Sequence, residues 1–118
     1  MAVEERHNKK LGAKGEKLAC RYLKKSGYKI LERDYECPCG EVDVIARKDG
    51  AFVFIEVKTR LTDGFGAPSE AVDLSRQKRY IRSAEYYFYG RQIEATVRFD
   101  VIEVFRGRIN HIENAFYC

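Results

Sequence analysis

The stretch GEVDVIARKDGAFVFIEVKTR, residues 40–60, decides the fold predicted for this chain. Two runs of alternating residues flank Asp49-Gly50, a dipeptide that favours the tight type I′ turn of a β-hairpin because both of its residues accept positive φ. Such a turn fixes the register of the two strands, so Lys48 pairs with Ala51. The sequence therefore predicts an antiparallel pair of strands at the centre of the fold.

Two carboxylates face each other in this predicted hairpin. Counting outward from the turn places Asp43 opposite Glu56, and directly opposed like charges destabilise a sheet unless something neutralises them. A divalent cation would do so, and Mg²⁺ prefers oxygen ligands of this kind. Lys58 follows Glu56 on the same strand face, where it is expected to orient a water molecule or to steady a phosphoryl charge. An exposed strand face with ordinary surface charges is the alternative interpretation.

Length and composition limit the class of protein. At 118 residues the chain is expected to form a single domain, residues 1–118, with one core. Its 45% hydrophobic and 34% charged residues are typical of a globular protein, and no apolar run approaches the ~20 residues of a membrane span. The basic start lacks the apolar segment of a signal peptide, so we expect a cytoplasmic protein with no membrane partner. A net charge of +4 does little by itself to indicate nucleic-acid binding.

A first helix is predicted from about Asn8 to Ser26, with Asn8 as its N-cap and Gly27 just beyond its end. Helical spacing gives it an apolar stripe of Leu11, Gly15, Leu18, Ala19, Tyr22 and Leu23. The opposite side is basic and carries Lys10, Lys14, Lys17, Arg21 and Lys24. Glu16 lies at the margin of the stripe, where it can reach the edge of a sheet or form an ordinary charge contact along the helix.

The other elements follow from turn residues and periodicity. We predict a strand over Tyr28 to Tyr35, a turn over Cys37 to Gly40, a loop over Leu61 to Pro68, a second helix from Ser69 or Ser75 to Phe88, and strands over Ala95 to Val104 and Arg108 to Ile112. The second helix has a predicted stripe of Leu74, Ile81, Ala84 and Phe88, with Gln77 inside it and Lys78 at its border. The order α, β, β, β, α, β, β predicts an α/β domain with a mixed central sheet flanked by helices.

The cysteines do not predict a zinc site. They stand at positions 20, 37, 39 and 118, which gives no Cys-x-x-Cys pair and no matching histidine spacing. Cys37 and Cys39 are therefore expected to be reduced thiols in a turn. Nothing in the spacing requires His111 or Cys118 to complete a metal site with them.

The residues singled out above resemble the motifs of a nuclease superfamily. The series Glu16, Gly40-Glu41-x-Asp43, Glu56-x-Lys58-Thr59-Arg60 and Gln77-Lys78 is similar to that of the restriction-endonuclease-like, or PD-(D/E)XK, superfamily. More narrowly, the chain resembles the bacterial YraN family of predicted endonucleases and, in motif layout, the archaeal Holliday-junction resolvases. Val42 stands where the superfamily's name has proline. The resemblance implies a restriction-endonuclease-like αβββαβ core.

The resemblance also implies a function. It implies a Mg²⁺-dependent DNA endonuclease, with Mn²⁺ as a substitute ion and with branched or junction DNA among the candidate substrates. The implied metal ligands are Asp43 and Glu56; Glu16 and Lys58 complete the catalytic set, Glu41, Gln77 and Lys78 support it, and Lys14, Lys17 and Arg60 contact phosphates. Cutting both strands takes two copies, so a homodimer is expected. Two other classes stay open: a DNA-binding module without appreciable turnover, and a protein-interaction domain that uses its aromatic second helix.

Overall fold

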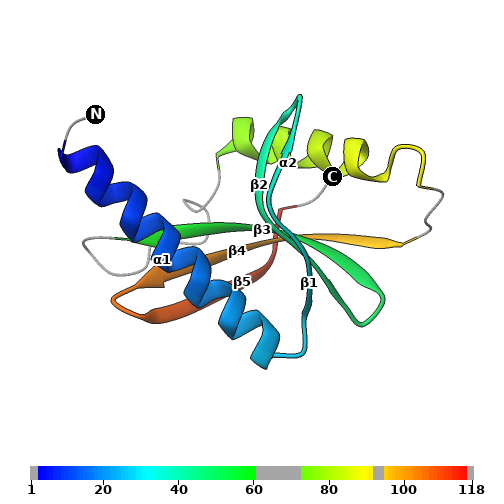
Figure 1. The fold of residues 1–118 in the computed structure, drawn as a ribbon. Coiled ribbons are helices and arrows are strands. Elements are labelled where there is room, and N and C mark those ends of the chain that lie inside the picture. The colour runs from blue at the N-terminus through cyan, green and yellow to red at the C-terminus, as the bar shows by residue number, and fades with distance from the viewer. Residues whose placement is uncertain (1–2, 61–72, 92–94, 117–118) are drawn as a thin grey trace.

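Five strands form one mixed sheet with a helix on each face (Figure 1). The computed structural model describes residues 3–60, 73–91 and 95–116, with side chains from residue 12 onward. The elements are α1 (Val3–Lys25), β1 (Lys29–Cys37), β2 (Gly40–Lys48), β3 (Ala51–Arg60), α2 (Leu74–Phe88), β4 (Thr96–Phe105) and β5 (Arg108–Phe116). The predicted α/β fold and its order of elements are confirmed.

The strands lie side by side in chain order, from β1 to β5. All neighbours are antiparallel except β3 and β4, which run parallel along ten paired residues from Ala51↔Thr96 to Arg60↔Phe105. A parallel pair needs a crossover connection, and α2 lies in the segment that joins these two strands. The C-terminal ends of β3 and β4 therefore lie side by side.

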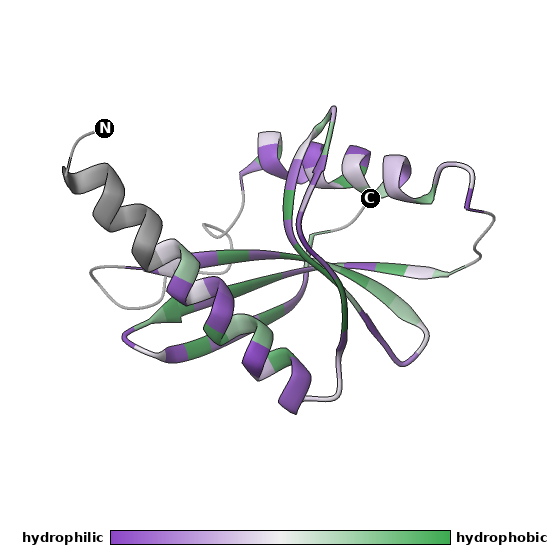
Figure 2. Ribbon diagram, in the orientation of Figure 1, coloured by the Kyte–Doolittle hydropathy of each residue, from purple (hydrophilic) through white to green (hydrophobic). Residues whose placement is uncertain are grey.

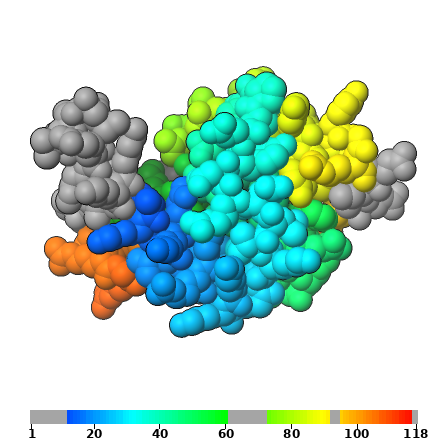
Figure 3. Space-filling model, in the orientation of Figure 1, coloured from blue at the N-terminus to red at the C-terminus, as the bar shows by residue number. Residues whose placement is uncertain are grey.

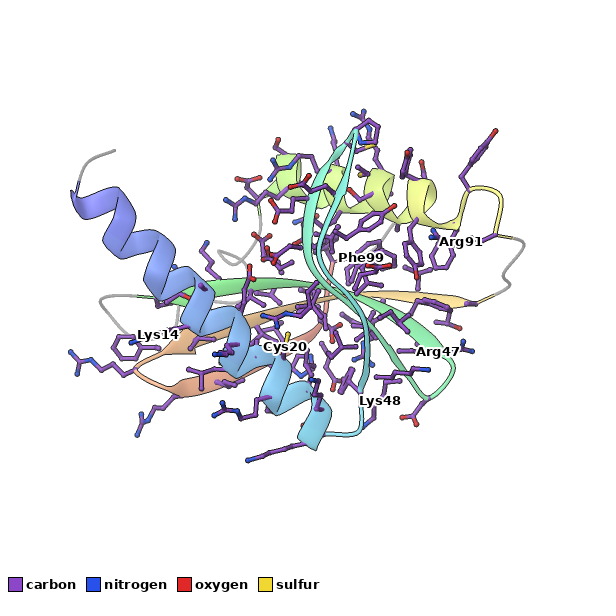
Figure 4. The ribbon with its side chains drawn as sticks, in the orientation of Figure 1. Lys14, Cys20, Arg47, Lys48, Arg91 and Phe99 are labelled. Atoms are coloured by element: carbon purple, nitrogen blue, oxygen red, sulfur yellow. The ribbon has the colours of Figure 1, made fainter. Side chains whose placement is uncertain are left out.

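Each helix covers its own hydrophobic cluster, and the strand segments between the helices are largely hydrophobic (Figure 2). The cluster between α1 and the sheet consists of Ala19, Cys20, Leu23, Tyr28, Val44, Ala46, Val53, Ile55, Ile102 and Val104. The cluster between α2 and the sheet consists of Val42, Ile45, Phe52, Phe54, Tyr80, Ala84, Tyr87, Phe99, Val101 and Phe116. In Figure 4 Cys20 lies between α1 and the sheet and Phe99 lies on the side of α2. Neither helix, over the residues described, has the length and apolar character needed to cross a membrane.

The first helix begins earlier than predicted and ends where predicted. It starts at Val3, so Asn8 lies inside the helix and is not its N-cap. No glycine or proline stands before Asn8, and acidic residues near a helix N-terminus favour the helix, which explains the extension. At the other end Gly27 has φ of +87°, while the backbone N–H of Tyr28 donates to the carbonyl of Leu23 at 2.9 Å. This bond and the left-handed glycine form a C-terminal cap.

The second helix begins at Leu74 with Asp73 as its N-cap, whose side chain accepts a 2.8 Å hydrogen bond from the backbone N–H of Arg76. Its buried face is formed by Tyr80, Ser83, Ala84 and Tyr87. Leu74 is 71% exposed, so its predicted place in the apolar stripe is wrong. The predicted start at Ser69 and the predicted loop Leu61 to Pro68 lie outside the described residues.

The last strand runs four residues beyond the predicted end, to Phe116. Asn114 has φ of +51°, and the pairing register shifts between Phe99 and Val101. This irregularity breaks the alternation that would mark a strand in the sequence. Beyond it, the ring of Phe116 stacks on that of Phe99 with centroids 4.8 Å apart.

The central hairpin has the predicted register next to its turn, but the ladder ends at Val44, so the predicted direct pairing of Asp43 with Glu56 is wrong. The pairs run from Lys48↔Ala51 to Val44↔Ile55. Val42 packs on the side of α2 whereas Val44 packs on the side of α1, so the predicted alternation is interrupted at Asp43. Figure 1 shows the reason: the start of β2 bends with β1 away from β3 and toward α2.

A buried polar network joins α1 to β4 and β5. The fully buried Asp100 accepts two hydrogen bonds from Arg98, and the Nε2 atom of His111 lies 2.6 Å from its carboxylate. The Nδ1 atom of His111 lies 2.9 Å from the hydroxyl of Tyr22 on α1. Burial raises the pKa of Asp100, but the hydrogen bonds from His111 and Arg98 outweigh it and hold the pKa below its ordinary value. We interpret this network as an anchor for α1.

Candidate metal centre

Three carboxylates from three elements converge at one point of the fold. Glu16 of α1, Asp34 of β1 and Asp43 of β2 each place one oxygen within 4.8 Å of the other two. Glu16 and Asp43 are half-buried, while Asp34 is exposed. Sequence analysis predicted Glu16 and Asp43 for this site, and the structure brings the two together.

Asp34 is the member that sequence analysis missed. The pairs Arg33↔Val44 and Tyr35↔Val42 place Asp34 directly across from Asp43 on the neighbouring antiparallel strand. Asp34 has φ of +51°, a left-handed conformation that aspartate adopts more readily than most residues. Its position depends on a register shift in β1 between Ile30 and Glu32, and no pattern in the sequence predicts this shift.

A close approach of α1 to β3 brings Glu16 to the sheet. Gly15 is buried, and a Cβ atom at this position would lie 2.1 Å from the Oγ1 atom of Thr59. Only glycine therefore lets the helix lie so near the strand. The next residue in the helix is Glu16, so this contact sets the distance between its carboxyl group and the acids of β1 and β2.

Burial and crowding raise the pKa of Glu16 to about 8. Desolvation is the largest cause, followed by the charge of Asp43 and by a hydrogen bond and charge from Asp34. Without a cation the three acids are expected to share at least one proton at neutral pH. A divalent cation would displace that proton and neutralise the cluster.

The Asp43 carboxylate is held by the backbone of β3. Its Oδ2 atom accepts a 2.8 Å hydrogen bond from the N–H of Val57, and its own N–H donates to the hydroxyl of Tyr80 at 3.4 Å. Burial raises the pKa of Asp43, and the Val57 N–H opposes the rise. Asp43 is thus fixed between β3 and α2. Beyond the last backbone pair, Val44↔Ile55, its side chain accepts the hydrogen bond from the Val57 N–H of β3.

Glu56 lies beside this cluster but outside the group of three. It is only 7% exposed, and its Oε1 atom accepts a 2.6 Å hydrogen bond from Arg76 of α2. Its Oε2 atom is buried and has no hydrogen-bond partner among the described residues. Burial raises the pKa of Glu56; Arg76 lowers it and the charge of Asp43 raises it. An orphaned buried carboxylate oxygen next to other acids fits a metal ion or its bound water as the missing partner.

The predicted supporting residues occupy different positions around the acids. Lys58 is half-buried on β3, and its charge lowers the pKa of Glu56. Glu41 is exposed on β2, and its pKa is raised by burial and by the charges of Asp34 and Asp43. Gln77 is half-buried in α2 and Lys78 is exposed.

Arg76 is the second residue that the sequence pattern did not predict, since helical spacing placed Gln77 and Lys78 toward the sheet instead. It lies three residues after the N-cap Asp73, in the first turn of α2, and it forms the ion pair with Glu56. The signal that would have found it is the N-cap itself. With the helix start fixed at Asp73, the buried face passes through Tyr80, and Arg76 lies one turn before that residue on the same face.

The predicted phosphate-binding residues lie beyond the acids, where α1 crosses the ends of the strands. Lys14 and Lys17 are exposed on α1. Arg60 ends β3, and its Nε atom donates a 2.8 Å hydrogen bond to the fully buried Glu103 of β4.

The cysteines do not join this centre. Cys20, Cys37 and Cys39 are free thiols, and the group of potential metal ligands found within the described residues contains none of them. The Sγ atom of Cys37 donates to the hydroxyl of Ser83 at 3.3 Å. An acidic, all-oxygen site of this kind suits a hard cation such as Mg²⁺ or Mn²⁺ and does not suit a thiolate-binding metal.

The sequence matches an established protein family along most of its length. The model of the family described as "Uncharacterised protein family UPF0102" matches residues 15–104. The chain is 43% identical over 118 residues to a UPF0102 protein of Caldanaerobacter subterraneus subsp. tengcongensis, with 93% of this chain and 97% of the relative covered. It is 48% identical over 107 residues to a UPF0102 protein of Thermodesulfovibrio yellowstonii, with 91% of this chain and 96% of the relative covered.

Proposed function

The chain belongs to the UPF0102 family, which is the YraN family, and from its acidic centre we propose that it is a metal-dependent DNA endonuclease that hydrolyses phosphodiester bonds. The observation that carries this proposal is the convergence of Glu16, Asp34 and Asp43 beside the buried Glu56 and the half-buried Lys58. This combination of acids and a lysine is the set that the PD-(D/E)XK resemblance implies, with Asp34 added.

Asp43 and Glu56 would hold the ion, with Glu16 as a further ligand or as the partner of a bound water. When bound, Mg²⁺ would stabilise the negative charge that develops on the phosphate and lower the pKa of a coordinated water. The orphaned Oε2 atom of Glu56 supports this assignment, because a buried carboxylate oxygen without a partner costs stability unless a ligand satisfies it. Mn²⁺ would substitute for Mg²⁺, since both take oxygen ligands.

Lys58 and Arg76 have separate roles in this proposal. Lys58 lies two residues from Glu56 on the same strand face, so its ammonium group would orient the attacking water or stabilise charge on the phosphate. Arg76 holds one oxygen of Glu56 and leaves the other oxygen available for the ion. Arg76 is a positioning residue, because it acts through Glu56.

The partner of the enzyme would be DNA, with branched or junction DNA among its substrates. A single acidic centre cuts one strand, so two copies in a homodimer would be needed to cut both. Activity on DNA would place the protein in the cytoplasm.

A protein-interaction domain remains the second candidate, and exposed aromatic residues of α2 favour it. Tyr80 and Tyr87 are buried in the core, whereas Tyr86 is 49% exposed and Tyr89, just after the helix, is 88% exposed. Large exposed aromatic side chains are enriched at contacts between proteins. Such a surface is compatible with an enzyme, because it lies on another part of the molecule from α1.

Incubation of the purified protein with labelled duplex, flap, single-stranded and four-way-junction DNA tests the proposal. Cleavage is expected with Mg²⁺ or Mn²⁺ and not with EDTA, and the Asp43→Asn variant is expected to be inactive under all conditions. Cleavage by Asp43→Asn at the wild-type rate would indicate a contaminating nuclease. If the wild type binds DNA but cuts none of the substrates with either ion, the protein is a binding module instead.

A further inference from the structure

A basic hollow lies next to the acidic centre, between α1 and the ends of β3 and β4. It has a volume of about 230 Å³, and its lining is Lys14, Gly15, Leu18, Thr59, Arg60, Val104, Arg106 and Gly107. Three of these residues are cations and none is acidic. A second hollow, lined by Lys14, Lys17, Leu18 and Arg21, shares Lys14 and Leu18 with the first and continues along α1.

Arg60 is fixed in this hollow by a buried partner. Its Nε atom bonds to Glu103, whose side chain is 0% exposed, while the Arg60 side chain is 22% exposed. The Nη2 atom of Arg60 is buried and has no hydrogen-bond partner among the described residues. Glu103 thus fixes the guanidinium group at the hollow, where the exposed part of the Arg60 side chain can contact a second anion.

Arg106 occupies a turn position that rarely carries arginine. Arg106 and Gly107 have φ of +49° and +77° and connect β4 to β5 after the closing pair Phe105↔Arg108. Two residues with positive φ form a type I′ turn, for which Asn or Asp before Gly is strongly favoured. Another two-residue hairpin turn of this protein, Asp49-Gly50, follows that preference. Arginine in a backbone conformation that it rarely adopts indicates a function for its side chain.

The position of Arg106 is also defined by its neighbours. Its guanidinium carbon lies 5.1 Å from the centroid of the Phe105 ring, so the exposed side chain has a contact that orders it. In Figure 3 the surface of the β4–β5 turn (orange) adjoins that of α1 (blue), and Figure 4 shows Lys14 projecting from α1 near the same turn.

We propose that this hollow binds backbone phosphates of the DNA strand that flanks the cut, with Arg106 as a phosphate contact beside Lys14 and Arg60. The inference rests on the proposed endonuclease function. The geometry suits it: β3 carries Glu56 beside the three acids and Arg60 in the hollow, four residues or ~13 Å apart at ~3.3 Å per residue. A DNA strand carries a phosphate at every nucleotide, so a strand cut at the acidic centre would bring flanking phosphates to the hollow.

Binding of fluorescein-labelled DNA in EDTA, followed by anisotropy at several salt concentrations, tests this site without cleavage. Arg106→Asn removes the charge and places in the turn a residue that prefers positive φ. Log K for DNA binding falls as log salt rises, and loss of one phosphate contact should make this slope shallower by ~0.9. That change corresponds to about fivefold weaker binding at 0.15 M salt, whatever the DNA sequence. Thermal melting should show no loss of stability, so a folding defect cannot account for the change.

Arg108→Gln is the matched control, because Arg108 is an exposed arginine on the other side of Gly107 and does not line the hollow. It should bind DNA like the wild type. Wild-type affinity and salt slope for Arg106→Asn, an equal loss for Arg108→Gln, or no binding of DNA by the wild type would each overturn the proposal.

Cleavage assays with Mg²⁺ separate this inference from the proposed function. If the wild type cuts DNA while Arg106→Asn binds normally, the endonuclease stands and the phosphate site fails. If the wild type never cuts but Arg106→Asn shows the expected loss of binding, the phosphate site stands on a DNA-binding module.

Discussion

Asp34 and Asp43 lie directly across from each other on neighbouring antiparallel strands, and Glu16 of α1 places a third carboxylate oxygen within 4.8 Å of theirs. Like charges in directly opposed positions destabilise a sheet. The protein keeps this arrangement next to Glu56, whose Oε2 atom is buried and has no hydrogen-bond partner among the described residues. The three carboxylates that a cation would bind therefore repel one another when no cation is bound, and this repulsion lowers the stability of the metal-free fold.

Asp43→Asn should separate stability from activity. Asparagine can keep the hydrogen bond from the Val57 N–H through its side-chain oxygen, while the loss of charge relieves repulsion with Asp34 and Glu16. The metal-free variant is expected to melt at the same temperature as the wild type or slightly higher, yet to bind no Mn²⁺ in a calorimetric titration and to cut no DNA. Asp49→Asn, in the exposed turn of the same hairpin, should change none of the three properties. Mn²⁺ binding of wild-type strength by Asp43→Asn would remove Asp43 from the site.

Metal-free protein should lose stability as the pH rises. The pKa of Glu16 is about 8 in the folded state and near 4.5 in the unfolded state, so between these values the folded state binds the extra proton. Stability is then fully present below about pH 4.5 and is lost progressively up to about pH 8. Urea midpoints in EDTA should fall across this window, and saturating Mn²⁺ should raise the midpoint most at the alkaline end. Glu16→Gln should flatten the metal-free profile, and an equally steep profile in that variant would assign the titration to another group.

Lys58→Ala should impair chemistry and spare binding. The acids that would hold the ion remain, so the Mn²⁺ affinity should stay near that of the wild type. Cleavage should fall by about two to three orders of magnitude if the ammonium group orients water or stabilises charge. Single-turnover cleavage and DNA anisotropy together measure both effects, with Lys29→Ala on the exposed part of β1 as the control. A Lys58→Ala variant that cuts DNA as fast as the control would leave the lysine without a catalytic role.

Gly15→Ala should push α1 away from β3. The new methyl group would lie 2.1 Å from the Thr59 hydroxyl oxygen, so overpacking is expected to cost about 1–3 kcal/mol of unfolding free energy. Gly12→Ala is the matched control: nothing lies within 4 Å of its added Cβ, and the change should stabilise the helix by about 0.5–1 kcal/mol.

The same contact can be tested by a double mutant. Gly15→Ala combined with Thr59→Ala should recover most of the lost stability, because the clashing hydroxyl is removed. Urea unfolding of the four variants measures the coupling. Independent effects of the two substitutions would show that the approach of α1 to β3 is not limited by this contact.

The sequence by itself determined the central hairpin, the order of elements and two acids of the centre. Asp49-Gly50 fixes the pairing of Lys48 with Ala51, because a two-residue turn leaves a single register, and helical spacing places Glu16 at the margin of the buried stripe of α1. These features follow from local geometry, in which residues close in the sequence restrict each other directly.

Only the tertiary structure decided which groups surround Asp43. The ladder between β2 and β3 ends at Val44, and the shifted register of β1 brings Asp34 opposite Asp43, while the N-cap at Asp73 turns Arg76 toward Glu56. The basic hollow likewise joins Lys14 to Arg106, which are 92 positions apart in the chain. Such contacts depend on bulges, strand bends and the packing of helices on a sheet. These features are set by interactions between residues far apart in the chain, so they leave no periodic signal in the sequence.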